Sequence, residues 1–411
     1  MTMQPGGQPP RRQGPRPLGL HLTTALTVLL SSPAGLPFLR NGSLPLPPSL
    51  RQRAQELASD LAASDPDELA RVVDREMRRR LDLLLTGVER YRRHTYRRNV
   101  EDPPAIWQEG RSRLLDFGGI GGAGGMPVLF VPSLVNRGYI LDLSARKSLA
   151  RWLTGRGMRV FVLDWGAPGP DERPAGLDEF IAGRLLRAAA AAKDAAEGQT
   201  LAAVGYCMGG LLALAAVQQR PDLFRSFVAL ATPWDFHADD PAAATRVAAM
   251  LPALEPALRL AGELPVDAIQ TLFAALDPLL VLKKFSRFAR LDPASPEAEE
   301  FVALEDWLND GIALPADVAR DCMEGWYGQN TPGRGMWKIA GRPVRPEQLR
   351  MRSLVVVPSR DRIVPPASAA ALGALIPEAE IWQPNLGHIG MIVSGNAPQT
   401  IWEPLHRWLA S

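Results

Sequence analysis

The 411-residue chain contains few cysteines and histidines, and this excludes several classes of protein. It has two cysteines, Cys207 and Cys322, and five histidines. Two cysteines so far apart do not form the framework of a disulfide-stabilised secreted domain, so a reducing cytoplasm is expected. They also exclude a cysteine-rich zinc site. Because an H-E-x-x-H motif is missing as well, we expect neither a metal nor a bound cofactor.

An excess of charge of one sign is also missing. The 46 Lys and Arg residues and the 44 Asp and Glu residues leave a formal net charge of +2. Nucleic-acid-binding domains usually carry a clear basic excess, so nucleic acid is not an expected partner. Hydrophobic residues make up 46% of the chain and charged residues 22%, which is typical of a globular protein.

The N-terminal segment, residues 1–50, lacks a long uninterrupted hydrophobic run. Residues 1–17 are rich in Pro, Gly and Arg and are expected to be disordered. Residues 18–39 are more apolar but are interrupted by Thr, Ser and Pro. They are followed by Pro45, Pro47 and Pro48. Three interpretations stay open: a segment that docks on a membrane or granule surface or caps the core, a signal peptide, or a membrane span.

Residues 51–110 are predicted to form an N-terminal helical region. Apolar residues recur there at three- and four-residue steps, as on one face of a helix: Leu69, Val72, Val73, Met77, Leu81, Leu84, Val88 and Tyr91. Pro66 predicts a break between two helices. The arginine-rich opposite face is typical of a solvated helix or, alternatively, of contact with an anionic partner.

Strand and helix patterns alternate from about residue 111 and predict an α/β core. The expected strands are 127–132, 157–163, 201–204, 226–231, 353–357 and one near 380–382, and the expected helices include 144–153 and 178–196. Near-continuous apolar strands separated by helices are typical of a mostly parallel sheet covered on both faces. The glycine-rich stretch 118–125 lacks the Lys and Ser/Thr of a phosphate loop, so it is interpreted as a turn.

This alternation stops between residues 236 and 348, where the pattern is helical and irregular. The α/β core is therefore predicted in two parts, 111–235 and 349–411, with a helical cap or lid inserted between them. In that position the cap is expected to cover the reactive group and to shape an apolar substrate tunnel.

The most informative stretch begins as an apolar strand and continues as Gly205-Tyr-Cys207-Met-Gly209. This is the G-x-S-x-G nucleophile elbow of α/β-hydrolases with cysteine in place of serine. The two glycines are needed because neighbouring side chains would collide with the backbone in so tight a strand-to-helix turn. The following helix directs its N-terminus at the sulfur and favours the thiolate. Cys207 is therefore the predicted nucleophile.

A thiol nucleophile needs a base and the base needs an orienting acid, which in this fold follow the nucleophile in the order acid, histidine. Asp361 comes just after the strand 353–357, and His388 lies on a glycine-flanked loop near the C-terminus. His237 is a rival base but comes too early in the chain, and Asp164 is a rival acid. The predicted triad is Cys207, Asp361 and His388.

Two main-chain amides are expected to form the oxyanion hole. Met208 follows the nucleophile directly, and Leu134 lies in the loop after the strand 127–132. Cys322 has no glycine elbow around it and is interpreted as a packed cysteine.

Several motifs, in this order along the chain, resemble those of the polyhydroxyalkanoate synthases, particularly the shorter two-subunit type. They are Tyr91-Arg-Arg-His-Thr-Tyr-Arg-Arg98, the stretch 131–143, Val162-Leu-Asp-Trp-Gly166, Gly205-Tyr-Cys-Met-Gly-Gly210, Ala231-Thr-Pro-Trp-Asp-Phe236, the stretch 301–307, the neighbourhood of 326–330 and Leu386-Gly-His-Ile-Gly390. Together they extend over roughly residues 80–408. The resemblance implies the α/β-hydrolase fold.

The resemblance also implies an acyltransferase that uses a 3-hydroxyacyl coenzyme A and extends a polyester chain. Cys207 would hold the acyl group as a thioester, His388 would activate the thiol and then the acceptor hydroxyl, and Asp361 would orient His388. The partners implied are a homodimer or second subunit and a polyester granule in the cytoplasm. The alternative is a cysteine hydrolase, either an intracellular polyester depolymerase or a thioesterase. A third hypothesis is a surface protein without enzymatic activity that kept the fold.

Overall fold

The computed structural model describes residues 12–46, 48–118 and 125–411, which form two compact units. The helical unit contains the described residues up to Tyr96 together with Asp277–Asn309, and the α/β unit contains Arg97–Leu276 and Asp310–Ser411. Pro47, most of the predicted tail and most of the predicted glycine-rich turn lie outside the described residues.

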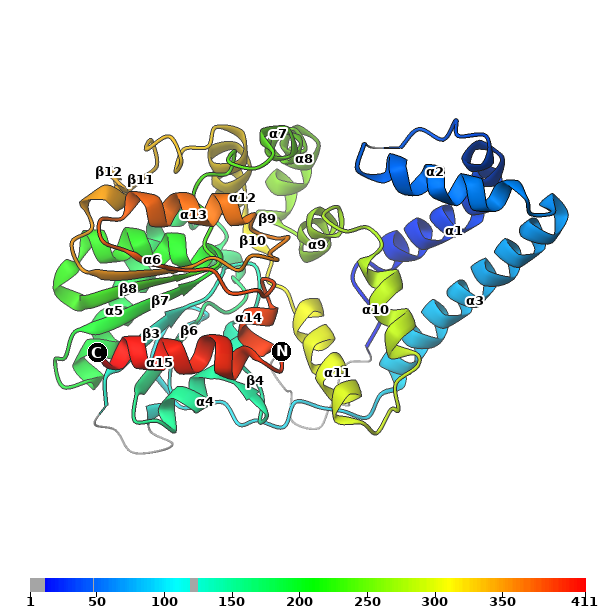
Figure 1. The fold of residues 1–411 in the computed structure, drawn as a ribbon. Coiled ribbons are helices and arrows are strands. Elements are labelled where there is room, and N and C mark those ends of the chain that lie inside the picture. Colours follow the sequence, from blue (N-terminus) through cyan, green and yellow to red (C-terminus); the bar gives the residue numbers. More distant parts are fainter. Residues whose placement is uncertain (1–11, 47, 119–124) are drawn as a thin grey trace. The chain divides into compact units, whose positions relative to one another are not determined.

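Amphipathic and apolar helices make up the helical unit (Figure 1). They are α1 (Leu18–Arg40), α2 (Pro48–Ala62), α3 (Pro66–Arg93), α10 (Leu280–Phe288) and α11 (Pro296–Asn309). The predicted break at Pro66 is confirmed. Asp65 caps α3 by accepting hydrogen bonds from the amides of Asp67 and Glu68, and Pro66 occupies the first turn, where its missing N–H costs nothing.

The core of this unit lies between α3 and α10. Leu84, Val88 and Tyr91 of α3 are buried against α10 residues that include Phe285. The two helices approach closely at Gly87, where an added Cβ would lie 2.1 Å from the carbonyl oxygen of Phe285. Helix α1 packs by one face only. It is long and apolar enough to cross a membrane, yet only 11% of its most apolar window is buried.

The units differ from the predicted domain boundaries in several segments. The described residues before 51, predicted as a separate segment, belong to the helical unit, and residues 97–110, predicted as helical, belong to the α/β unit and contain strand β1. Residues 277–309, predicted as part of the cap, belong to the helical unit. The physical reason is the apolar face that α10 and α11 share: Phe285, Phe288 and Val302 pack with α3 residues in one cluster. A helical pattern shows that such a face exists but not which element covers it.

An eight-stranded sheet forms the centre of the α/β unit, in the order β1-β2-β6-β3-β7-β8-β13-β14. Its strands are β1 (Ala105–Glu109), β2 (Ser112–Asp116), β3 (Pro127–Val131), β6 (Arg159–Asp164), β7 (Leu201–Tyr206), β8 (Phe224–Leu230), β13 (Arg352–Val356) and β14 (Glu380–Trp382). The pairings of β1 with β2 and of β2 with β6 are antiparallel, and the others are parallel. The six predicted strands are confirmed, with shifted ends.

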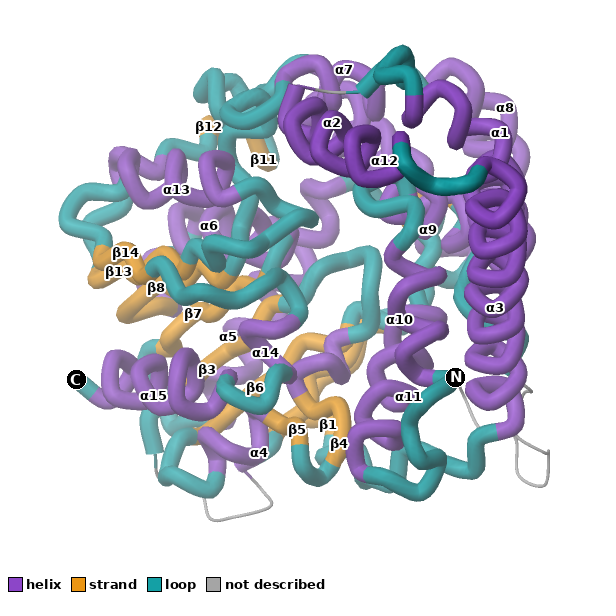
Figure 2. Tube along the Cα trace, turned by 45° about the vertical axis from the view of Figure 1, so that its right-hand side comes forward, coloured by secondary structure: helices purple, strands orange, loops and turns teal. Residues whose placement is uncertain are grey.

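Helices cover both faces of this sheet, as the apolar strands predicted. Helices α4 and α15 lie on one face, and α6 and α13 on the other (Figures 1 and 2). The helical segments of this core are η2 (Gly138–Leu141), α4 (Leu149–Thr154), η3 (Pro170–Glu172), η4 (Glu179–Leu185), α5 (Leu186–Ala195), α6 (Met208–Gln219), η5 (Pro221–Leu223), η7 (Pro346–Gln348), α13 (Pro366–Leu375), α14 (Gly390–Val393), η8 (Pro398–Trp402) and α15 (Glu403–Ala410). The predicted helix 178–196 is a π-helix, η4, that continues as α5.

The rest of the insertion between β8 and β13 is a small, mainly helical layer. Its elements are α7 (Pro241–Ala248), α8 (Leu251–Ala261), β9 (Glu263–Leu264), α9 (Val266–Ala274), β10 (Leu314–Pro315), α12 (Ala316–Arg320), the π-helix η6 (Asp321–Gly328), β11 (Lys338–Ile339) and β12 (Arg342–Pro343). Strands β9 and β10 pair antiparallel, as do β11 and β12. This layer is the part of the predicted cap that belongs to the α/β unit.

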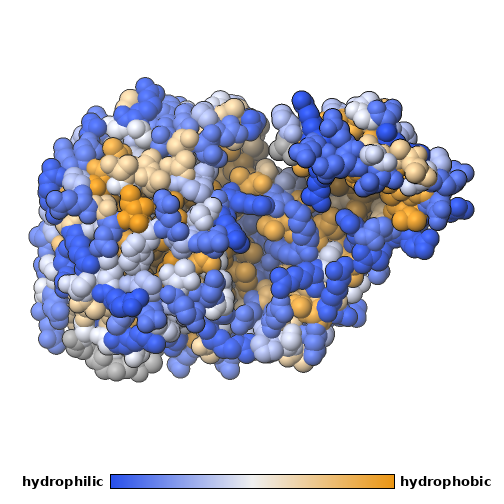
Figure 3. All heavy atoms as spheres, in the orientation of Figure 1, coloured by the Kyte–Doolittle hydropathy of each residue, from blue (hydrophilic) through white to orange (hydrophobic). Residues whose placement is uncertain are grey.

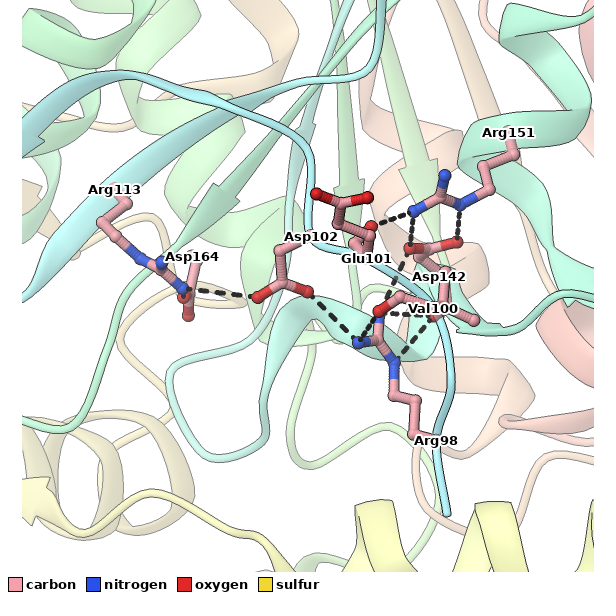
Figure 4. Close-up of polar contacts among 8 residues, drawn as sticks. All are labelled: Arg98, Val100, Glu101, Asp102, Arg113, Asp142, Arg151 and Asp164. Carbon is pink, nitrogen blue, oxygen red and sulfur yellow. Dashed lines mark hydrogen bonds and ion pairs between the residues drawn. The ribbon is translucent and has the colours of Figure 1, made fainter. Parts of the chain in front are cut away.

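The predicted helix 144–153 is wrong in its first half. Strands β4 (Asp142–Ser144) and β5 (Lys147–Ser148) form a short hairpin before α4 begins. The cause is the buried carboxylate of Asp142, which accepts hydrogen bonds from the guanidinium groups of Arg98 and Arg151 (Figure 4). A buried carboxylate needs such partners, and they hold the chain extended until Ser148 caps α4.

Candidate active site

The three predicted catalytic residues lie at one edge of the sheet. Cys207 follows β7, Asp361 follows β13 and His388 follows β14. The sheet order β7-β8-β13-β14 places these parallel strands close together. Since parallel strands have their carboxyl ends at the same edge, the loops that carry the three side chains meet there.

Cys207 occupies a strained turn between β7 and α6. Its φ of 57° and ψ of −129° are a combination that residues other than glycine rarely adopt. The main-chain N–H of Cys207 donates to the carbonyl oxygen of Leu230 in β8 at 2.8 Å. The turn thereby remains tied to the sheet and directs the sulfur away from it.

The glycines around Cys207 are required by close packing of main chain. A Cβ at Gly205 would lie 2.3 Å from Cα of Gly210, and one at Gly209 would lie 1.9 Å from the carbonyl oxygen of Val131. Real Cβ atoms essentially never come so close to backbone atoms. The tight elbow predicted from the glycine spacing is therefore present.

His388 and Asp361 form a buried pair. Nδ1 of His388 lies 2.6 Å from Oδ2 of Asp361, and both side chains are almost fully buried. The other carboxylate oxygen of Asp361 accepts main-chain hydrogen bonds from Ile363 at 2.8 Å and Val364 at 2.9 Å. These bonds fix the carboxylate, which in turn fixes the imidazole ring.

The electrostatic environment favours a protonated His388. Burial is the largest single influence and opposes protonation, but the negative charge of the Cys207 sulfur and the hydrogen bonds with Asp361 and Cys207 outweigh it. Together they raise the pKa of His388 from 6.5 to about 10. An imidazolium held in this way is the group that stabilises a thiolate nucleophile in cysteine enzymes.

The predicted oxyanion donors lie at the start of α6 and in the loop after β3. Met208 is the first residue of α6, so its amide is one of those that have no acceptor within the helix. Leu134 lies in the loop directly after β3, and Gly209 packs against the last residue of that strand, Val131. An oxyanion hole formed by Met208 and Leu134 stays a prediction.

The rival candidates have structural partners elsewhere. Asp164 accepts a hydrogen bond from Arg113 at 2.7 Å (Figure 4). Each of the four other histidines donates a ring N–H to a main-chain carbonyl oxygen: His21 to Arg16, His94 to Pro293, His237 to Tyr327 and His406 to Arg156. His388 is paired instead with the buried carboxylate of Asp361.

Aromatic residues pack together in the cap layer. The ring of Phe236 packs against Trp326 and Tyr327, with centroid distances of 5.8 and 5.0 Å. Burial, followed by the charges of Cys207 and Cys322, raises the pKa of Tyr327. Cys322 itself packs at the edge of the core, and burial raises the pKa of its thiol, so it remains a thiol.

Sequence reasoning missed two residues of this region, Tyr206 and Tyr327. The ring of Tyr206 stacks on that of His388, and its hydroxyl donates to the main-chain oxygen of His388 at 3.1 Å. One available signal was a polar group at the end of an otherwise apolar buried strand, next to the nucleophile. Tyr327 has no comparable signal, because its contacts with Phe236 and His237 arise only through the folding of η6.

Metal-ligating residues do not gather at this edge. Within residues 12–46, 48–118 and 125–411, no group of three or more His, Cys, Asp and Glu side chains is placed to hold a metal ion.

This chain matches a known protein family and is similar in sequence to several known proteins. The profile of the α/β hydrolase fold family matches residues 126–394. The Poly(3-hydroxyalkanoate) polymerase subunit PhaC of Synechocystis sp. is 28% identical over 293 residues, which are 69% of this chain and 78% of that protein. The protein of the same name from Allochromatium vinosum is 27% identical over 288 residues, 69% of this chain and 80% of the relative.

A third relative with this name comes from the archaeon Haloferax mediterranei. It is 27% identical over 291 residues, which cover 69% of this chain but only 58% of the relative. Among solved structures, a monoacylglycerol lipase from Paleococcus ferrophilus shares 17% identity with a TM-score of 0.45, covering 72% of this chain and 97% of the lipase. Because the family match spans more than half of its residues, this chain belongs to the α/β hydrolase fold family, within which it is similar to poly(3-hydroxyalkanoate) polymerase subunits.

Proposed function

We propose that this protein is a polyhydroxyalkanoate synthase-like acyltransferase with Cys207, His388 and Asp361 as its catalytic triad. The observation that carries the proposal is a cysteine at the nucleophile elbow, at the same edge of the sheet as a histidine that is paired at 2.6 Å with a buried carboxylate. The names of the relatives support the choice of substrate, a 3-hydroxyacyl coenzyme A, and of product, a polyester.

In the first half-reaction the Cys207 thiolate attacks the thioester carbonyl of the substrate. Amides of Met208 and Leu134 stabilise the oxyanion that forms. The bond between the acyl carbon and the coenzyme A sulfur then breaks, and His388 gives its proton to the leaving thiolate. The products are free coenzyme A and an acyl group bound to Cys207 as a thioester.

In the second half-reaction His388 acts as the base. Acylation removes the negative charge of Cys207, which is the strongest influence raising the pKa of His388. The neutral ring can then accept the proton of an acceptor hydroxyl while that oxygen attacks the acyl carbon. An ester forms, and the Cys207 thiolate and the His388 imidazolium are restored.

Cysteine suits this transfer better than serine would. Exchange of one thioester for another is nearly balanced in free energy, so the acyl group stays activated for the next hydroxyl. A serine ester would lose that activation. Cys207 and Phe236 both pack against the core cluster that contains Trp326, and such apolar surroundings support the proposal because they favour an acyl chain over water.

The proposal is tested by supplying purified protein with 3-hydroxybutyryl coenzyme A and measuring free coenzyme A and polymer together. We expect both products, and neither from Cys207→Ala. Cys322→Ala is the matched control and should retain activity, because its thiol lies outside the elbow. Coenzyme A without polymer would contradict transfer and support the thioesterase alternative. Turnover that survives Cys207→Ala would contradict the triad.

We also propose that α1 holds the enzyme to its polyester granule in the cytoplasm. Its exposed apolar side chains include Leu30, 60% exposed, and Phe38, 53% exposed. Apolar groups are visible over this unit in Figure 3, and a helix that is apolar all round needs a cover on its outer face. Leu30→Glu with Phe38→Glu should abolish co-sedimentation with polyester particles and leave turnover unchanged. Wild-type binding to lipid vesicles but not to polyester would contradict this choice of surface.

A second chain is the remaining partner in the proposal. The relatives are named as polymerase subunits, which supports a homodimer or a complex with another subunit. Light scattering on the purified protein, alone and with substrate, measures the mass directly, and a monomer at all concentrations would contradict the homodimer.

A further inference from the structure

The nucleophile and the base are joined by the side chain of one residue, Tyr206. It is the last residue of β7, directly before Cys207, and it is 4% exposed. Its hydroxyl donates to the main-chain carbonyl oxygen of His388 at 3.1 Å. Its ring also stacks on the imidazole, with centroids 5.3 Å apart and planes inclined by 30°.

The main chain just before His388 is tied by hydrogen bonds to the oxygens of Leu386 and Gly387, and Tyr206 adds a bond at His388 itself. The residue lies in the connection between β14 and α14, with Gly387 before it and Gly390 two residues after it. Asp361 fixes one ring nitrogen, but a hydrogen bond at a single atom still allows the ring to tilt. The phenol of Tyr206 restricts both the main chain and the ring plane.

The hydroxyl of Tyr206 stays a donor throughout the working pH range. Burial, followed by the charges of Cys207 and Asp361, raises its pKa well above the ordinary value of 10. Cys207 and Asp361 are also the two ionisable groups that act on His388. The carbonyl oxygen of His388 therefore always faces a protonated phenol.

We propose that Tyr206 is a positioning residue, whose hydroxyl and ring hold the imidazole of His388 in line with the sulfur of Cys207. The inference deepens the proposed function and rests on it, since it takes His388 to be the base for Cys207. A phenylalanine would fill the same volume. The tyrosine adds a buried hydroxyl that donates a hydrogen bond to the main-chain oxygen of His388, the proposed base.

The test compares Tyr206→Phe with Tyr91→Phe in a Cys322→Ala background, where Cys207 is the only thiol. Tyr91 is a suitable control because it too is buried and donates one hydrogen bond, to Asp306, in the other unit. Both variants lose one buried donor, but only the first should change His388. Two measurements need no substrate: the rate at which iodoacetamide alkylates Cys207, and the titration of His388 followed by ¹⁵N NMR.

We expect Tyr206→Phe to slow alkylation by about threefold to tenfold, the range expected for the loss of one hydrogen bond. The midpoint of the His388 titration should fall below that of the parent protein, because a less well-placed imidazole interacts less with the thiolate. Tyr206→Leu, which also removes the stacked ring, should have a larger effect. Tyr91→Phe should leave both measurements unchanged.

An unchanged alkylation rate together with an unchanged His388 midpoint in Tyr206→Phe would overturn the proposal. Equal changes in both tyrosine variants would overturn it too, because they would show a general loss of stability. Failure of the proposed function looks different. In that case the parent protein would transfer no acyl group, while Tyr206→Phe would still alter the reactivity of Cys207.

Discussion

The two units of this protein are stabilised in different ways. In the α/β unit, all residues of β3 and β7 are buried, and glycines let main-chain segments touch around the nucleophile. In the helical unit, α1 packs by one face, and large apolar side chains such as Leu30 and Phe38 remain exposed.

Polar contacts compensate for part of this difference. In the helical unit the guanidinium of Arg12 donates two hydrogen bonds to Asp306, one to the carbonyl oxygen of His94 and one to that of Tyr96. Lys284 pairs with the buried Glu305 at 2.7 Å. The α/β unit also has buried ion pairs, such as Arg151 with Asp142 and Arg159 with Asp116, besides the pair of His388 and Asp361 at the site. Both units therefore contain close main-chain contacts and buried ion pairs, and the difference lies in the long apolar helix that the helical unit leaves largely exposed.

The largest effect is expected from Asp361→Asn in the α/β unit. The amide would donate toward Nδ1 of His388 instead of accepting, and a negative charge that favours the imidazolium would be lost. Acyl transfer should fall on the order of 10²-fold or more. Because Asp361 raises the pKa of His388, its removal should lower that pKa from about 10 and cause the ring to lose its proton at lower pH.

Steady-state kinetics and a His388 titration check this prediction. Asp164→Asn is the matched control, because Asp164 pairs with Arg113 away from the histidine and should leave the titration unchanged. Full activity in Asp361→Asn would show that the pair of His388 and Asp361 has only a structural role, like the pair of Lys284 and Glu305 in the helical unit.

The next largest effect is expected from Gly209→Ala. The new Cβ would lie 1.9 Å from the carbonyl oxygen of Val131 and 2.7 Å from that of Pro132. Both are main-chain atoms, which cannot move aside as the end of a flexible side chain can. We expect a loss of more than about 3 kcal/mol in the free energy of unfolding. Urea unfolding followed by Trp fluorescence reports mainly this unit, because only Trp307 lies in the helical unit. An unchanged urea midpoint would show that close main-chain packing at Gly209 does not contribute to the stability of the α/β unit.

Arg12→Ala tests the polar ties of the helical unit. Its side chain is 9% exposed, and its removal leaves Asp306 and two carbonyl oxygens without these donors. A loss of about 1–3 kcal/mol is expected, because unsatisfied buried acceptors are costly. Arg79→Ala is the control: Arg79 pairs with Glu76 but is 53% exposed, so its loss should not change the melting temperature measured by circular dichroism. Equal shifts of the melting temperature in Arg12→Ala and Arg79→Ala would mean that burial of the arginine does not determine its contribution to stability.

The smallest effect is expected from Gly35→Ala in α1. No atom lies within 4 Å of the added Cβ, so the residue meets open space. Alanine should stabilise the helix by about 0.5–1 kcal/mol, since glycine loses more conformational freedom in a helix. Amide hydrogen exchange in α1 measures the gain. Faster amide exchange in the variant would mean that the added methyl group disturbs a contact on the outer face of α1. The helical unit would then be more closely packed than described above.

Much of the α/β unit could be predicted because its information is local. The six predicted strands are confirmed since runs such as Val128-Leu-Phe-Val131 are apolar enough to be buried on both faces. Gly205 and Gly209 mark the elbow, and chain order alone selected Asp361 and His388, which the fold brings within 2.6 Å of each other. The hairpin at Asp142 was missed because its partner, Arg98, is 44 residues away.

The sequence by itself determined the buried strands, the sharp turn at Cys207 and the order of the acid and the base, because each depends on residue type and spacing. Only the tertiary structure decided that residues 277–309 join the helical unit and that Tyr206 supports His388, 182 positions later. The physical reason is that an apolar face or a buried hydroxyl requires a partner, while the identity of that partner depends on which distant segments the completed sheet brings together.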